Sequence, residues 1–262
     1  MKVLRVIITA MIALAVVVNV TVASPTGDDI QKVVNSFVEH IDGLESVEAD
    51  KKSRAQKVIG EVGKDSPDAI TEGLIHLYPA YSQAIEMSDA EETDQAIDSL
   101  QELSQSNDKY LSADASFYLA RTLMNAERFE EALPILQQLT GKLGQFSVHQ
   151  GNSQYFIGVA QAGLLKNQDA IQSFMTFLSF NPDAPERLRV SAWRQAQELQ
   201  SIQDGKLDDI YQRMDYSRRR LTLKETGDQT QGEQDKIVDL LTKLIKEEEK
   251  KECSSNCKKG GT

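Results

Sequence analysis

The sequence has few cysteines, which cross-link a chain, and few prolines and glycines, which interrupt helices. Of its 262 residues, 2 are cysteine, 6 are proline and 15 are glycine, and aromatic residues make up 6%. Both cysteines, Cys253 and Cys257, lie at the C-terminal end, so disulfides cannot hold the core together. Proline and glycine are the main interrupters of helices, and no segment after residue 23 shows the alternation typical of strands. Helix is therefore the expected secondary structure.

Basic side chains are also scarce relative to acidic ones. The chain has 29 lysine and arginine residues against 40 aspartate and glutamate residues, which gives a formal net charge of −11. An acidic surface repels the phosphates of nucleic acids and favours solubility. We therefore expect no nucleic-acid partner.

Residues that carry catalysis in a recognisable arrangement are missing. The three histidines, His40, His76 and His149, are far apart, and none lies at a metal-binding helix spacing or near a nucleophile motif. We therefore expect no catalytic residues, no metal site and no cofactor, and hence no enzyme.

The first 23 residues have the pattern of a signal peptide. Lys2 and Arg5 precede an apolar run from Val6 to Val18, and small or apolar residues stand at Thr21 to Ala23. The run is shorter than the ~20 residues that span a bilayer, so we expect cleavage after Ala23 and export to the periplasm or the medium. Removal of Lys2 and Arg5 leaves 27 basic against 40 acidic side chains, a net charge of −13. The alternative is a protein anchored by this segment uncleaved; no other membrane contact is expected.

Residues 24–77 predict an N-terminal helical region. Apolar residues recur at spacings of three and four, which marks one face of a helix, and they include Ile30, Val34, Phe37, Ile41, Val58 and Ile59. Pro67 after Asp65 and Ser66 is typical of a helix start.

Residues 78–222 carry an internal repeat. Ala96, Ala132 and Ala170 are 36 and 38 residues apart, and each follows a small residue on the preceding predicted helix, namely Ala84, Ala120 and Gly158. Small residues let two helices pack closely, and a period in this range indicates stacked helical hairpins. A fourth hairpin is expected from Ser191 to about Leu221.

The segment Phe129–Leu139, FEEALPILQQL, and the turn Asn181-Pro182-Asp183 resemble the tetratricopeptide repeat family. The resemblance implies an all-α superhelix of stacked hairpins that binds another protein or a peptide in a groove lined by the first helix of each hairpin. It places six residues in that groove: Tyr81, Ile85, Phe117, Arg121, Tyr155 and Val159. The alternative is that these aromatic residues fill gaps between neighbouring hairpins. The C-terminal half is also similar to exported bacterial repeat proteins, a likeness that implies no function.

One basic cluster interrupts the acidic sequence near the end of the repeats. Its members are Arg213, Arg218, Arg219, Arg220 and Lys224. It either docks an acidic partner or an anionic membrane surface, or it is neutralised by the end of its own helix and by nearby acids. The last interpretation is favoured.

Residues 223–229 predict a linker, 230–252 a detached amphipathic helix, and 253–262 a tail with both cysteines. The helix has one apolar stripe, made of Ile237, Val238, Leu241, Leu244 and Ile245, in a register that fits a short coiled coil. Cys253 and Cys257 could form a disulfide within one chain or between two chains.

These observations predict an all-α, tetratricopeptide-like superhelix with N-terminal capping helices and a detached C-terminal helix. The expected function is an exported scaffold that mediates protein–protein interaction through its repeat surface, without catalysis. The alternative is a structural protein that forms a homo-oligomer through the C-terminal helix and the cysteines.

Overall fold

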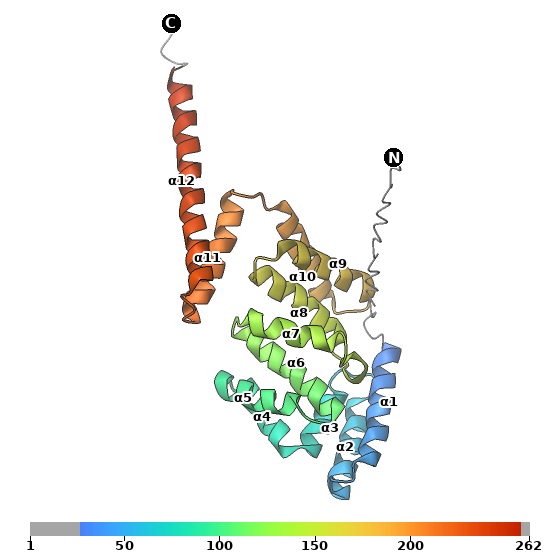
Figure 1. Ribbon diagram of the computed structural model, residues 1–262. Helices are drawn as coiled ribbons and strands as arrows, with labels where there is room; N and C mark the ends of the chain where they lie inside the picture. Colours follow the sequence, from blue (N-terminus) through green and yellow to red (C-terminus); the bar gives the residue numbers. More distant parts are fainter. Residues whose placement is uncertain (1–26, 258–262) are drawn as a thin grey trace, which may run out of the picture.

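The computed structural model describes residues 27–257, and this part of the chain contains helices and no strand (Figure 1). The α-helices are α1 (Gly27–Gly43), α2 (Ala49–Val62), α3 (Ala69–Leu77), α4 (Pro79–Asp89), α5 (Thr93–Ser104), α6 (Lys109–Asn125), α7 (Phe129–Leu139), α8 (Gln150–Gly163), α9 (Asn167–Phe180), α10 (Glu186–Ser201), α11 (Leu207–Thr222) and α12 (Asp228–Cys257). A short 3-10 helix, η1 (Gly144–Phe146), lies between α7 and α8. The all-α prediction is confirmed. The predicted signal peptide, 1–23, lies outside the described residues.

Three hairpins form the middle of the stack, α4 with α5, α6 with α7, and α8 with α9. The small residues expected at their crossings are all buried, as listed here: Ala84, Ala96, Ala120, Ala132, Gly158 and Ala170. A Cβ on Gly158 would lie 2.7 Å from the ring of Phe174, so only glycine lets α9 approach α8 this closely. The predicted stacking of hairpins is confirmed.

The turn inside each hairpin repeats one backbone conformation. Its last residue has a positive φ, 60° at Glu91, 57° at Glu127 and 59° at Leu165. The next backbone N–H then donates to a carbonyl five residues earlier, as Arg128 does to Leu123 at 2.9 Å. This bond closes the end of the first helix and reverses the chain.

The same turn occurs once more, between α11 and α12. Lys224 has a φ of 61°, and the N–H of Glu225 donates to the carbonyl of Arg220 at 2.8 Å. The expected fourth hairpin at 191–221 is therefore wrong: α10 packs against α9, whereas α11 pairs with α12.

The C-terminal helix is not detached, because α11 packs along it as far as Glu247. Arg213 of α11 donates to Glu233 of α12 at 2.6 Å, and Lys206 lies 3.8 Å from Glu247. These ion pairs join two helices that the sequence pattern placed on either side of a linker. The apolar pattern of each helix, taken by itself, does not predict a contact between charged side chains. The last turns of α12 project beyond α11 (Figure 1). We call α11 and α12 together the arm.

At the other end, α2 and α3 form a hairpin on which α1 packs. A Cβ on Gly73 of α3 would lie 2.8 Å from Phe37 and 2.9 Å from Ile59, which places three helices around one glycine. None of the helices between residues 27 and 257 is both long enough and apolar enough to cross a membrane.

Candidate functional site

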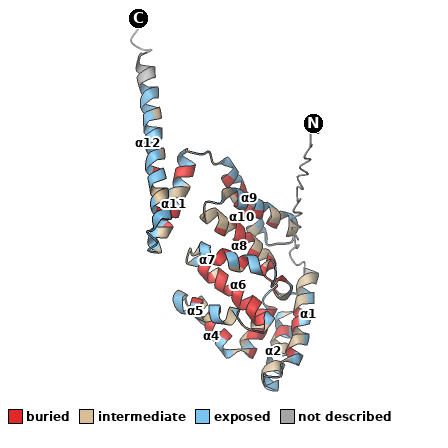
Figure 2. Ribbon diagram, viewed as in Figure 1, coloured by how far each residue is buried: buried red, intermediate tan, exposed pale blue. Residues whose placement is uncertain are grey.

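Helix α6 is enclosed on nearly all sides, because α3 covers the face that a free repeat would present as its groove. Of the 17 residues in α6, 14 are buried (Figure 2). At the centre of the contact, Asp114 accepts hydrogen bonds from Thr71 at 2.9 Å and from Tyr81 at 2.6 Å. The Nε2 atom of His149 lies 3.1 Å from the other carboxylate oxygen. This buried network ties α3, α4 and the start of α8 to α6.

Burial beside this carboxylate affects the neighbouring phenols. Burial and then the charge of Asp114 raise the pKa of Tyr118 to about 12, and the same two causes raise the pKa of Tyr81 well above 10. Both side chains are therefore neutral at physiological pH, and Tyr81 acts as a hydrogen-bond donor.

The prediction that Tyr81, Phe117 and Tyr155 line an exposed groove is wrong, because this packing buries them. Tyr81 is fully buried, and Ile85 and Phe117 are 8% and 4% exposed. Phe117 stacks on His149 with ring centroids 3.9 Å apart. The sequence pattern could not show this, because the covering helix α3 precedes the repeats.

The remaining predicted groove residues are also engaged within the chain. Tyr155 is 9% exposed, and its hydroxyl lies 2.9 Å from Ser191 of α10. Arg121 lies over the ring of Tyr118 at 4.6 Å and 3.4 Å from Asp89, and Val159 is half-buried. The alternative interpretation, that these aromatic residues fill gaps between helices, fits the structure.

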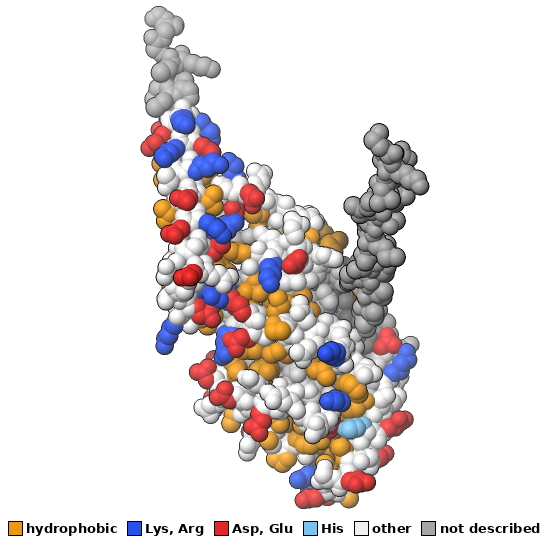
Figure 3. All heavy atoms as spheres, in the orientation of Figure 1, with side chains coloured by type: hydrophobic (Ala, Val, Ile, Leu, Met, Phe, Trp, Pro, Cys, Tyr) orange, Lys and Arg blue, Asp and Glu red, His pale blue; other side chains and the backbone are white. Residues whose placement is uncertain are grey.

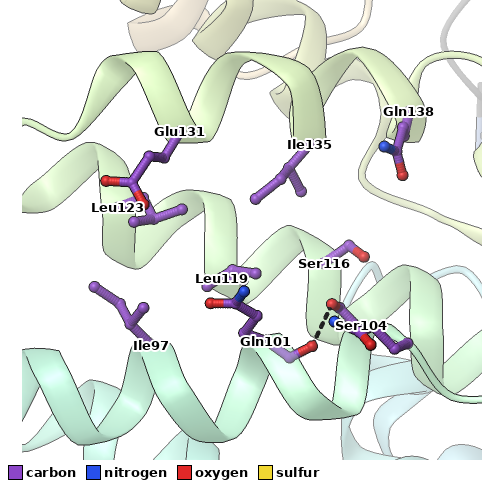
Figure 4. Close-up of a pocket in the computed structure, with 10 residues that line it drawn as sticks. Ile97, Gln101, Ser104, Ser116, Leu119, Leu123, Glu131, Ile135 and Gln138 are labelled. Carbon is purple, nitrogen blue, oxygen red and sulfur yellow. Dashed lines mark hydrogen bonds between the residues drawn. The ribbon is translucent and has the colours of Figure 1, made fainter.

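An open hollow lies on the other face of the repeats, between α5 and α7 with α6 as its floor (Figure 4). Its volume is about 350 Å³. The apolar part of its lining is Ile97, Leu119, Leu123 and Ile135. Ile97, Leu119 and Leu123 are buried, so the floor is fixed by the core and does not depend on flexible side chains.

The rim of the hollow is polar and nearly neutral. It consists of Gln101, Ser104, Gln105, Ser116, Glu131 and Gln138. The one charged member, Glu131, accepts two hydrogen bonds from Arg128, at 2.6 and 2.8 Å. These bonds are the main cause of the raised pKa of Arg128. The exposed amides of Gln101, Gln105 and Gln138 can each donate and accept hydrogen bonds.

The sequence contains a signal for this hollow that a search for aromatic residues misses. Ile97, Gln101 and Gln105 are spaced by four along one helix, which places their side chains on one face. Ile135 and Gln138 are spaced by three on the next second helix. Amides beside an apolar residue on one face of each of two neighbouring repeat helices indicate a shared groove.

The predicted basic cluster lies elsewhere and attaches the arm to the repeats. Arg219 is 2% exposed and donates two hydrogen bonds to Glu130, both of 2.8 Å, and a third to the backbone carbonyl of Glu127. Arg218 binds the carboxylate of Glu127, and Arg220 also binds Glu130. The expectation that nearby acids neutralise the cluster is therefore met for these three arginines.

The electrostatics of Glu130 follow from this contact. Burial by itself raises the pKa of the carboxyl, but hydrogen bonds from Arg219 and Arg220 outweigh it, so the pKa lies below 4.5. Glu130 is thus ionised at neutral pH and paired with two guanidinium groups.

Within residues 27–257, no group of three or more His, Cys, Asp or Glu side chains is arranged to hold a metal ion. Cys253 and Cys257 fall in the last turns of α12, and their pairing stays a prediction.

The family assignment agrees with this architecture. Residues 88–150, which include α5, α6 and α7, match the family model of the tetratricopeptide repeat. Residues 88–150 thus carry the tetratricopeptide repeat, as the sequence predicted. Repeats of this family generally mediate protein–protein interaction and typically form non-catalytic scaffolds.

A comparison with solved structures gives a match to a Podosopora anserina protein of nearly identical TPR-like repeats. It shares 11% sequence identity and covers 64% of this chain and 95% of its own, with a TM-score of 0.38. No curated protein matches the chain.

Proposed function

We propose that this protein is an exported scaffold that binds an extended segment of a partner protein in the hollow between α5, α6 and α7. The observation that carries the proposal is the combination of a rigid apolar floor with a rim of side-chain amides. The repeat family supports the general role, and the lining of the hollow supports this location for the proposed binding.

The chemistry of the hollow favours a peptide segment. An apolar side chain of the segment would contact Leu119, Leu123 and Ile135, while its backbone N–H and C=O groups would bond to the glutamine amides of the rim. The volume of about 350 Å³ lies within the range of ligand sites, roughly 300–1,000 Å³. Since Glu131 is already paired with Arg128, the rim gives no strong preference for a charged segment.

A library of random peptides displayed on phage tests the proposal with the mature chain, residues 24–262, as immobilised target. Peptides selected on the wild type would be compared on a Gln101→Ala plus Gln138→Ala variant, which removes two rim amides. We expect affinity to fall by at least about tenfold, which corresponds to the loss of one or two hydrogen bonds.

The matched control is a Glu102→Ala plus Gln137→Ala variant. Both residues are exposed neighbours on α5 and α7 that do not line the hollow. We expect this variant to bind like the wild type. Selected peptides that bind all three proteins equally would place binding outside the hollow and reject this site.

Export is part of the same proposal and rests on the basic, apolar and small-residue pattern of residues 1–23. Mass spectrometry of the protein from its native host is expected to find a chain that begins at Ser24. A chain that begins at Met1 and fractionates with membranes would favour the anchored alternative. The absence of catalysis remains an expectation from the sequence, and self-association through the C-terminal helix is a separate proposal that does not depend on the hollow.

A further inference from the structure

Among the residues that the structure describes, the exposed large apolar side chains are concentrated on the arm, and Figure 3 shows apolar side chains along it. Seven of them belong to α11 and α12, with exposed fractions from 36% to 71%, as follows: Leu207, Tyr211, Met214, Leu221, Val238, Leu241 and Ile245. By contrast, the floor of the repeat hollow is mostly buried. A soluble protein seldom groups exposed apolar residues in this way unless the surface has a partner.

The spacing of these residues on α11 is that of a coiled-coil seam. Leu207, Tyr211, Met214, Arg218 and Leu221 follow one another at intervals of four, three, four and three residues. Such intervals keep side chains on one face and present them to a second helix. Arg218, the one charged member, is already held by Glu127 and Asp215.

Helix α12 has a second apolar stripe besides the one that packs on α11. Val238, Leu241 and Ile245 are spaced by three and four and are exposed, whereas Ile237 is 8% exposed and Leu240 lies beside Gly205 at the base of α11. The apolar stripe that the sequence predicted as one surface thus divides into two sets. One set, with Ile237, packs on α11, and the other set, with Val238, Leu241 and Ile245, is exposed.

The two exposed stripes lie on the same side of the arm. Arg213 and Glu233 mark the sides on which α11 and α12 face each other. At about 100° per residue, each stripe is rotated from that direction by roughly 120° in the same sense along its own helix. Because the helices are antiparallel, equal rotations bring both stripes to one common face. Arg219, which binds Glu130 of the repeats, lies on the other face of α11.

We propose that this face binds the same face of a second copy of the chain, so that two arms form a four-helix bundle. An isologous pair of this kind needs one self-complementary surface, and two parallel apolar stripes supply it. Burying the seven side chains on both copies removes on the order of 1,400 Å² of surface, within the ~1,200–2,000 Å² of specific protein interfaces.

Charge does not oppose the approach of a second copy. Arg218, the charged residue of the α11 seam, is paired with Glu127 and Asp215. The two-fold contact therefore does not bring unneutralised like charges together at that position. Since the seam is self-complementary and its area matches that of a specific interface, it favours a second copy over an unrelated partner.

Sedimentation equilibrium on the mature chain, with reductant present to exclude disulfide links, tests the proposal. We expect the wild type to have twice the mass of one chain. A Tyr211→Glu plus Val238→Glu variant places one charge on each stripe, and we expect it to sediment as a single chain. Both residues are largely exposed, 71% and 61%, so the helix content by circular dichroism should not change.

The matched control is Met175→Glu plus Val190→Glu, which alters apolar residues of comparable exposure, 45% and 53%, on α9 and α10. We expect the control to keep the mass of two chains. A Tyr211→Ser plus Val238→Ser variant provides a milder change if the glutamates disturb folding, and its dimer should dissociate at least about tenfold more readily.

A wild-type protein that stays a single chain up to the highest concentration reached would overturn the proposal. A variant in which both stripes are changed but which keeps the mass of two chains would also overturn it, because the contact would then lie elsewhere. The Gln101→Ala plus Gln138→Ala variant should remain a dimer, which separates this proposal from binding in the hollow.

Discussion

A single carboxylate, that of Asp114, organises the centre of this protein. It is 2% exposed and binds side chains from α3, from α4 and from the residue that precedes α8. A buried acceptor of this kind is stabilising only while its donors are present, and the donors depend on it in the same way.

We expect Asp114→Ala to lower the free energy of unfolding by about 3 kcal/mol, since it leaves the hydroxyls of Thr71 and Tyr81 buried without their acceptor. Urea unfolding followed by circular dichroism measures the change. Glu102→Ala, an exposed acidic residue on α5, serves as control and should alter stability by less than about 0.5 kcal/mol. Equal stability of the two variants would show that the network contributes nothing to the fold.

At this scale the sequence predicted the small residues and missed the burial of the aromatic ones. Ala96, Ala132 and Ala170 were identified because a close crossing needs a small side chain wherever it occurs in a repeat. The exposure of Tyr81 and Phe117 depends instead on whether another part of the chain covers them. Helix α3 covers this region, and its Thr71 shares the acceptor Asp114 with Tyr81. A single threonine belongs to no repeat or apolar periodicity, so the sequence does not predict this contact.

Among the helical elements, the four tight turns are the most uniform feature. Each turn places a residue other than glycine at a φ near 60°, which costs an L-amino acid about 1 kcal/mol. Glu91 is exposed, so its side chain can be removed without disturbing the core.

Glu91→Gly is therefore expected to leave stability unchanged or to raise it by about 0.5 kcal/mol, because relief of the strained φ exceeds the added entropy of the unfolded chain. Gln95→Gly, at an exposed position inside α5, should instead destabilise the protein by about 0.5–1 kcal/mol. Thermal unfolding of the two variants distinguishes these outcomes. A loss of stability in Glu91→Gly as large as that in Gln95→Gly would contradict the argument.

The helices themselves were predictable from the sequence, whereas the pairing of the last ones was not. Periodicity marks the apolar face of α10, α11 and α12 separately, and the sequence pattern therefore joined α10 and α11 in a fourth hairpin. The structure pairs α11 with α12 because Arg213 meets Glu233 and because Lys224 forms the same turn as the repeats. A contact between charged side chains that are 20 residues apart leaves no mark in an apolar pattern.

For the whole molecule, the contact that holds the arm against the repeats is the arginine cluster of α11. Arg219, Arg220 and Gln212 reach the starts of α7 and α9, through Glu130 and Asn167. We expect Arg219→Ala to cost about 2 kcal/mol, less than a fully buried pair because Glu130 is 35% exposed and keeps Arg220.

Hydrogen exchange measures the effect locally, as faster exchange in residues 207–245 with little change in α4 to α9. Arg194→Ala, which removes an exposed pair with Glu198, is the control and should exchange like the wild type. Faster exchange across the entire chain would show that the arm and the repeats unfold as one unit.

Acid should weaken the same contact. The folded-state pKa of Glu130 lies below 4.5, so its pairing contributes stability above pH 4.5 and loses it as the pH falls through the lowered value. The pKa of Glu233 is lowered as well, since hydrogen bonds from Lys236 and Arg213 outweigh the opposing effect of burial. We therefore expect the protection factors of the arm amides, which correct for the slower intrinsic exchange in acid, to fall below pH 4.5 before those of the repeats do. A simultaneous fall would contradict this order.

The short connection between α10 and α11 determines what happens when a protease cuts the chain there. Only residues 202–206 link the repeats to the arm covalently, whereas the arginine cluster links them across space. A protease that cuts beside Gly205 would therefore produce two fragments that stay together at neutral pH. The molecule can in this way survive a break in its backbone as a non-covalent complex of its own two parts.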